Sequence, residues 1–174
     1  KEKYPHARLI SRAHSYDLYE YRAREDYLPF RKLIFDQADA LYPISQSAYD
    51  YLKTSYPYLD MEKVQIRHLG TLDQGLNPPK KEGEPYRLVS CSSLSPVKRV
   101  DRILESLALL DRGPIEWVHF GSGEDLEEQK EKARQLFRGR PVSFLFQGQV
   151  SNLEIYRYYQ ENHVDLFLNA SIIE

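Results

Sequence analysis

The sequence has few of the features that mark membrane, disulfide-rich or nucleic-acid-binding proteins. It holds one cysteine, Cys91, in 174 residues, which excludes an internal disulfide and a cysteine-based zinc site. A formal net charge of −2 gives no overall field that would attract nucleic acid. No apolar run approaches the roughly 18 residues that a membrane-spanning helix needs. With 41% hydrophobic and 29% charged residues, the composition is typical of a soluble globular protein.

The second half of the chain alternates between short apolar runs and amphipathic helical patterns. The runs are continuous rather than alternating, which is typical of parallel strands buried on both faces. Apolar residues recur at helical spacing in VDRILESLALL (100–110), and SNLE (151–154) has the Ser-x-x-Glu form of a capping box. The pattern predicts an α/β fold with a parallel sheet. The predicted strands are 87–91, 115–120, 141–146 and 164–168.

The first half shows the same alternation less regularly. Pro29 is well placed as the first residue of a helix, on which Phe30, Leu33 and Ile34 are predicted to face inward. A second helix is expected to end near Ser55. The predicted strands are 7–13, 39–45 and 63–69.

A boundary is predicted between these halves. The stretch GTLDQGLNPPKKEGEPY (70–86) is rich in glycine, proline and charge, which is the composition of a linker. The sequence therefore predicts one domain in residues 1–69 and another in residues 87–174.

Loops that follow the strands of the second half carry the groups most suited to chemistry. Ligands of parallel α/β sheets bind beyond the carboxyl ends of the strands, so these loops are expected to share one site. Gly121 and Gly123 allow the backbone to approach a ligand, and amides at the next helix start favour an anion. Lys98 and Arg99 supply positive charge, and Glu174 supplies an acceptor for hydroxyl groups. Together they suit a phosphorylated sugar or a nucleotide.

Four segments in order, VSCSSLSPVKRVDRILESLALL, WVHFGSGEDLEE, FLFQGQVSNLEIYRYY and VDLFLNASIIE, closely resemble the C-terminal domain of family-four glycosyltransferases. ISRAHSYDLYE (10–20) and DALYPISQSAYDYL (39–52) resemble parts of the N-terminal domain of that family. The resemblance implies a retaining enzyme of the GT-B fold, in which two Rossmann-like domains face a cleft. It also implies that the chain is an incomplete piece, with the end of the first domain and a truncated donor-binding second domain.

The resemblance assigns roles to individual positions. Lys98 matches the Lys that neutralises the donor diphosphate, and Glu174 matches the first of two Glu residues that contact the transferred sugar. Ser93 stands where the family usually has an Arg, and Arg99 is the candidate to compensate for it. His14 matches a His that approaches the reacting sugar from the N-terminal domain. The remaining donor-binding positions are Gly121, Ser122 and Gly123 near the phosphates, and Gln147, Gly148, Gln149, Val150 and Ser151 near the base.

The expected activity is transfer of a sugar from a UDP- or GDP-sugar to a glycan, lipid or small-molecule acceptor, as in polysaccharide biosynthesis. No Asp-x-Asp pair is visible, so no metal or other cofactor is expected. The resemblance implies hexosyl transfer by the whole protein, an inactive isolated chain, and a cytoplasmic location, including the membrane face. Peripheral membrane association would then involve parts outside this chain, and no nucleic-acid partner is expected.

Two other readings of the sequence remain open. A strand that ends in Gly-Ser-Gly also occurs in methyltransferases that use S-adenosylmethionine, although an acid should then close the next strand. That strand is followed here by Gln147 and Gly148, which argues against a methyltransferase. The other alternative is a nucleotide-sugar-binding module without catalysis, which Ser93 favours.

Overall fold

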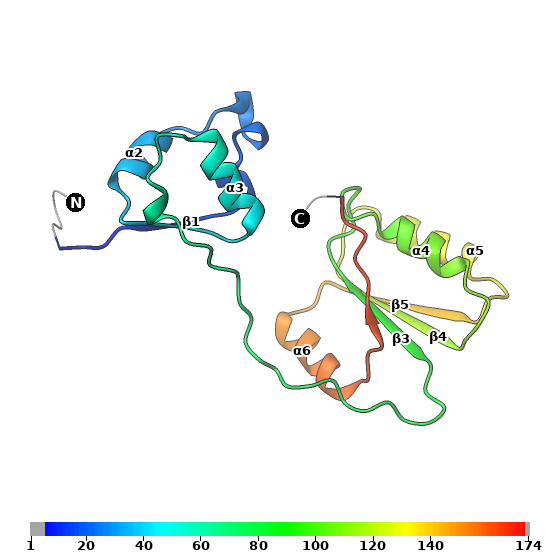
Figure 1. Cartoon of the computed structure of the whole chain (residues 1–174). Coiled ribbons are helices and arrows are strands. Elements are labelled where there is room, and N and C mark those ends of the chain that lie inside the picture. The colour runs from blue at the N-terminus through cyan, green and yellow to red at the C-terminus, as the bar shows by residue number, and fades with distance from the viewer. Residues whose placement is uncertain (1–5, 173–174) are drawn as a thin grey trace. The chain divides into compact units, whose positions relative to one another are not determined.

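The computed structural model describes residues 6–172, and the chain divides into two compact units, Lys1–Leu72 and Asp73–Glu174 (Figure 1). Both units are α/β, with parallel strands flanked by helices. Within residues 6–172, no helix combines the length and the apolar character that a bilayer crossing requires.

Unit 1 is built on two parallel strands, β1 (Ile10–Ala13) and β2 (Ala40–Pro43), in the register Ile10 to Ala40. Its core gathers Leu18, Phe35, Leu41, Leu52 and Tyr56. The helices are α1 (Ser15–Leu18), α2 (Arg31–Gln37) and α3 (Gln46–Ser55), with short 3-10 helices at Glu20–Arg22, Arg24–Asp26 and Met61–Lys63.

The prediction for the helix at Pro29 was wrong in its start and its buried face. Phe30 adopts left-handed backbone angles (φ 59°) as the N-cap, so α2 begins only at Arg31. Phe30, Leu33 and Ile34 are exposed, whereas Phe35 is buried against the unit 1 core. The buried face is therefore rotated from the one that the apolar pattern suggested.

The predicted strand at 63–69 is reduced to one bridge, between Val64 and Leu41. The amides of Gln65 and Arg67 still donate to the carbonyls of Leu41 and Pro43, so the segment follows β2 without forming a regular strand. Only Val64 of this segment is buried among the core residues of unit 1, which explains the weak pairing of the rest.

Unit 2 contains one four-stranded parallel sheet in the order β5-β4-β3-β6. The first strand in the sequence therefore lies inside the sheet, and successive strands are added first on one side of it and then on the other. This is the arrangement of a doubly wound, Rossmann-like sheet. The strands are β3 (Tyr86–Cys91), β4 (Ile115–Phe120), β5 (Val142–Gly148) and β6 (Leu166–Phe167), and the helices are α4 (Val100–Ala108), α5 (Leu126–Leu136) and α6 (Asn152–Glu161).

Helices cover both faces of this sheet, as predicted. Figure 1 shows α4 and α5 on one face and α6 on the other. On the first face, Trp117 packs with Leu104 and Ala133. On the second, Val118 and Phe120 pack against Tyr158 of α6 and its neighbours. Burial on both faces explains why adjacent residues of β4, Trp117 and Val118, are both apolar.

The strand predicted at 164–168 is shorter and more exposed than expected. Only Leu166 and Phe167 form β6, and each remains about half exposed. β6 pairs with β3 alone among the described strands, so no strand within residues 6–172 pairs with its outer side. β5, at the opposite side of the sheet, also alternates between buried or half-buried and exposed positions rather than being buried throughout.

The predicted capping box at the start of α6 is confirmed. The Glu154 amide donates to Ser151 Oγ at 3.3 Å, and the Ser151 amide donates to the Glu154 carboxylate at 2.8 Å. Replacement of Ser151 by Ala is therefore expected to lower the free energy of unfolding by about 1 kcal/mol. Urea denaturation followed by the fluorescence of Trp117, the only Trp, would measure this change in unit 2. An unchanged midpoint would show that the cap contributes nothing.

Candidate functional site

The loops that follow the four strands of unit 2 form one continuous rim. Neighbouring loops are joined by backbone hydrogen bonds in the same order as their strands, so the rim is a fixed extension of the sheet. The strand order changes direction between β3 and β6, and ligands of open α/β sheets bind at such a switch point. The connecting bonds, donor first, are Gly121 to Gly148 (2.8 Å), Leu94 to Ser122 (3.0 Å) and Ile172 to Val97 (3.0 Å).

The two glycines of the β4 loop are needed for contact between loops. A Cβ atom at Gly121 would lie 1.8 Å from the carbonyl oxygen of Ser92, and one at Gly123 would lie 2.1 Å from that of Leu94. Gly121 also has φ +131°, which other residues rarely adopt. From the sequence, these glycines were predicted to allow close approach of a ligand. The structure adds a second reason, because no side chain fits between the β3 and β4 loops.

A pocket of about 190 Å³ opens at this rim, on the side of α6. It is framed by three loops that the sequence analysis had singled out, those after β3, β4 and β5. Cys91, Asn152 and Ile155 also line it, and none of them was predicted. The position of Asn152 could have been predicted from the sequence, because the capping box makes it the first residue of α6. The predicted site residues that line the pocket are Ser93, Gly121, Gln149 and Val150.

The remaining predicted residues of unit 2 lie along the same loops outside this pocket. Lys98 is half-buried in a turn after β3, where its amide donates to the carbonyl of Ser95. Arg99 has left-handed angles (φ 49°) as the N-cap of α4 and lines a different pocket. Ser122 and Gly123 lie on the loop after β4, and Ser151 is the N-cap of α6. Gln147 and Gly148 were predicted on the loop after the third strand of this unit, but β5 extends to Gly148, so they are its last two residues.

Two predicted residues cannot be placed with this group. Glu174 lies outside the described residues. His14 belongs to unit 1, where it precedes α1, and its exposed amide donates to the carboxylate of Asp17. The position of His14 relative to the rim of unit 2 therefore stays a prediction.

A buried polar cluster lies between β3 and β4, next to the rim. Ser90 Oγ accepts a hydrogen bond from Trp117 Nε1 at 3.0 Å, and a second hydrogen bond joins it to His119 Nδ1 at 2.8 Å. His119 is completely buried, and its burial lowers the pKa of the imidazole to about 4. The Ser92 carbonyl acts in the opposite direction, although Nε2 forms no regular hydrogen bond within the described residues. His119 is therefore neutral at pH 7 and serves packing.

Cys91 is poorly suited to nucleophilic chemistry in this pocket. Burial raises the pKa of its thiol, so the neutral form predominates at pH 7. Within residues 6–172, no group of three or more His, Cys, Asp or Glu side chains is arranged to hold a metal ion. The chemistry that the rim offers is thus hydrogen bonding by backbone and small polar groups, with the cations Lys98 and Arg99 nearby in the sequence.

Several solved glycosyltransferase structures share this fold. WaaB, a lipopolysaccharide outer core galactosyltransferase in its apo form, matches 89% of this chain at 16% identity with a TM-score of 0.65. The Anabaena protein Alr3699/HepE, in complex with UDP and glucose, matches 94% at 15% identity and 0.61. The pneumococcal O-GlcNAc transferase GtfA, in complex with UDP and GlcNAc, matches 99% at 16% identity and 0.60. No protein-family model matches the sequence, and neither does a curated protein.

The chain spans less than half the length of each of these three enzymes. It covers 41% of WaaB, 46% of HepE and 35% of GtfA. The likeness therefore defines the architecture of the chain, which is that of the Rossmann-like halves of GT-B glycosyltransferases. At these identities it shows the fold alone.

Proposed function

We propose that unit 2 is the donor-binding part of a glycosyltransferase that uses a nucleotide-diphosphate sugar. The observation that carries the proposal is the rim of hydrogen-bonded loops, with a pocket lined by Ser93, Gly121 and Gln149, on a fold that glycosyltransferases share. HepE and GtfA were solved with UDP, which makes UDP the first nucleotide to test. The finer proposal, from sequence resemblance, is a retaining hexosyltransferase of family four that acts in polysaccharide biosynthesis.

The charges on the β3 loop suit the bond that such an enzyme breaks. Cleavage of a sugar–phosphate bond leaves negative charge on the diphosphate and positive charge on the anomeric carbon. Fixed cations stabilise the leaving group, and preorganised electrostatics of this kind are usually the largest catalytic contribution. We assign this role to Lys98 alone, because Arg99 lines a different pocket. We assign contact with the sugar to Glu174 and His14. The proposal includes no metal or other cofactor.

Replacement of Lys98 by Ala is expected to weaken UDP binding about tenfold or more, because a charge-assisted contact to phosphate is lost. Isothermal titration of UDP and GDP into the chain would measure this. Arg140→Ala is the matched control, since Arg140 is an exposed cation two residues before β5, at the amino-terminal end of that strand and away from the rim. Equal affinities for the two variants and the unaltered chain would remove Lys98 from the site.

The same titration separates the alternatives. Binding of S-adenosylmethionine, without binding of UDP or GDP, would favour a methyltransferase. That alternative is the weaker one, because Gln147 and Gly148 stand where a methyltransferase should have an acid. A binding module without catalysis would bind UDP equally well. We further propose that the chain belongs to a longer protein, in which a module of this kind would show no sugar transfer. The isolated chain is expected to bind donor without turnover, and measurable transfer by residues 1–174 alone would contradict this.

A further inference from the structure

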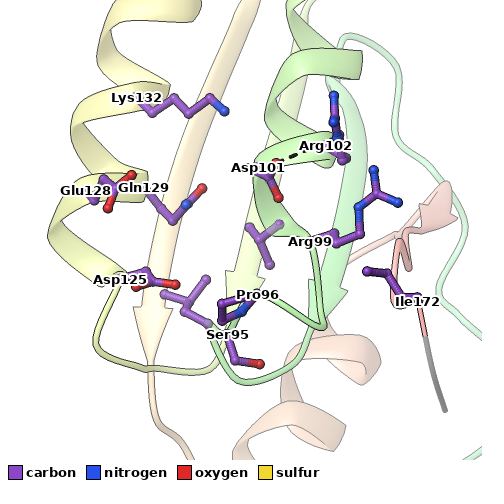
Figure 2. A pocket seen from close by; sticks show the side chains of 12 residues that line it. Ser95, Pro96, Arg99, Asp101, Arg102, Asp125, Glu128, Gln129, Lys132 and Ile172 are labelled. Carbon is purple, nitrogen blue, oxygen red and sulfur yellow. Dashed lines mark ion pairs between the residues drawn. The ribbon is translucent and has the colours of Figure 1, made fainter.

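A second and larger pocket, of about 450 Å³, lies between the first turns of α4 and α5 (Figure 2). Its volume falls in the range of about 300–1,000 Å³ that is usual for small-molecule sites. It shares no lining residue with the 190 Å³ pocket at the rim, and none of its residues except Arg99 was assigned a role above. A function for it is therefore independent of the proposed donor site.

Gln129 of α5 is the strongest sign that this pocket takes a ligand. Its side chain is directed from α5 toward α4, into the pocket (Figure 2). The residue is only 9% exposed, and its Oε1 atom has no hydrogen-bond partner within the described residues. A buried polar atom left unpaired costs about 1–3 kcal/mol, so such atoms usually have a partner that completes them. The partner that suits Oε1 is a donor, such as a hydroxyl group.

The charged groups around Gln129 fall into two sets. Arg102 pairs with Asp101 at 3.8 Å and with Glu105 at 2.8 Å, and Lys132 pairs with Glu105 at 2.8 Å, so these side chains already have partners (Figure 2). Arg99, Asp125 and Glu128 have no ion pair within residues 6–172. The free groups are thus one guanidinium and two carboxylates.

This set of free groups selects a class of ligand. A phosphate would be repelled by Asp125 and Glu128, and a polyamine would be repelled by Arg99. A neutral polyol satisfies all of them, because each hydroxyl group both donates and accepts hydrogen bonds. Leu94, Val100 and Ile172 add apolar surface to the wall, against which the carbon–hydrogen face of a sugar ring can pack.

We infer that the α4–α5 pocket is a saccharide-binding site, separate from the donor site, that holds a neutral sugar residue through Gln129, Asp125, Glu128 and Arg99. Acids at the first turn of α5 also stabilise the helix dipole, and that role alone would explain the carboxylates. It does not explain a buried amide without a partner. Gln129 is therefore the residue on which the test turns.

The test uses NMR of the full chain titrated with methyl glycosides of glucose, galactose and N-acetylglucosamine at millimolar concentration. At least one glycoside is expected to shift the side-chain amide of Gln129 and the backbone amides of residues 125–132. Gln129→Leu is expected to weaken this binding about tenfold while the chain keeps or gains stability, since an apolar group replaces an unpaired polar one. Gln135→Leu, on the exposed side of the same helix, is the matched control and should change neither.

Other outcomes overturn the inference. No response at residues 125–132 to any of the three glycosides would mean that the pocket holds only solvent. Equal binding by Gln129→Leu would place the sugar elsewhere. A response of the Gln129 amide to UDP would show that the pocket belongs to the donor site. UDP is expected to shift residues 147–152 instead, so the spectra report failure of the proposed donor site separately.

Discussion

Replacement of Gly121 by Ala is expected to lower the free energy of unfolding of unit 2 by about 3 kcal/mol or more. The new Cβ atom would lie 1.8 Å from the Ser92 carbonyl oxygen, which belongs to backbone that the β-sheet holds in place. The backbone angle at Gly121 (φ +131°) adds strain for any side chain. Urea denaturation followed by Trp117 fluorescence would measure the loss, and UDP binding is expected to fall with it because the β3 and β4 loops must separate.

Gly148→Ala is the control for this experiment. Gly148 also has a positive φ (+74°) and lies on the same rim, but a Cβ atom there meets nothing within 4 Å. Gly148→Ala should therefore lower the free energy of unfolding only through backbone strain, by about 1–2 kcal/mol. Equal losses for the two variants would show that contact between the loops is unimportant and that backbone strain explains both.

The second large effect is a dependence of stability on pH that comes from His119. Burial lowers the pKa of this imidazole from its ordinary value of 6.5 to about 4. Between these values the unfolded chain binds a proton that the folded chain does not, so stability is lost as the pH falls through this window. The shift corresponds to about 3 kcal/mol by pH 4. Urea denaturation at a series of pH values between 7 and about 4 would show this slope.

Carboxylates contribute to the same curve at lower pH. Hydrogen bonds from Lys132 and Lys130 lower the pKa values of Glu105 and Glu127, respectively, from 4.5, so their contributions are lost only below that value. The region above about pH 4.5 therefore isolates His119. His119→Gln should reduce the slope of stability against pH in this region, even if the variant is less stable. A slope that survives His119→Gln would assign the effect to another group.

The alternation of strands and helices in unit 2 was predictable because each element has a strong local pattern. VDRILESLALL contains a helical stripe, and the buried face of α4 uses Val100, Ile103, Leu104 and Leu107, as that stripe requires. Sequence order alone does not show which strands become edges. β5 and β6 were predicted as buried throughout, yet both are edges among the described strands, and Leu145 and Leu166 are about half exposed. The neighbours of a strand are decided by tertiary packing, which leaves little trace in a short apolar run.

Unit 1 was less predictable for a related reason. Its helix α2 has apolar residues around most of its circumference, so the pattern at 30–35 did not specify one buried face. Phe30 took left-handed angles, and Phe35 became the core residue. A two-stranded sheet also offers few partners, which explains why only Val64 of the predicted strand at 63–69 forms a bridge.

The candidate site was predictable in its loops but not in its pockets. Strand ends are visible in the sequence, and the loops after β3, β4 and β5 do frame one pocket. The α4–α5 pocket was not foreseen, because it depends on how two helices lie side by side. Gln129 lies in the first turn of α5, and its burial is not evident from the pattern LEEQKEKARQL. Only the packed structure shows that its amide lacks a partner.

The bonds that join the rim loops come from main-chain amides and carbonyls rather than from side chains. Exchange of Ser93, Gln149 or Val150 should therefore alter what the pocket recognises without altering its outline. A library randomised at these three positions should contain mostly folded members with varied nucleotide preference. In such an architecture the backbone of the rim and the specificity of the pocket can evolve separately. Only Gly121 and Gly123, which allow the β3 and β4 loops to touch, are fixed by the backbone.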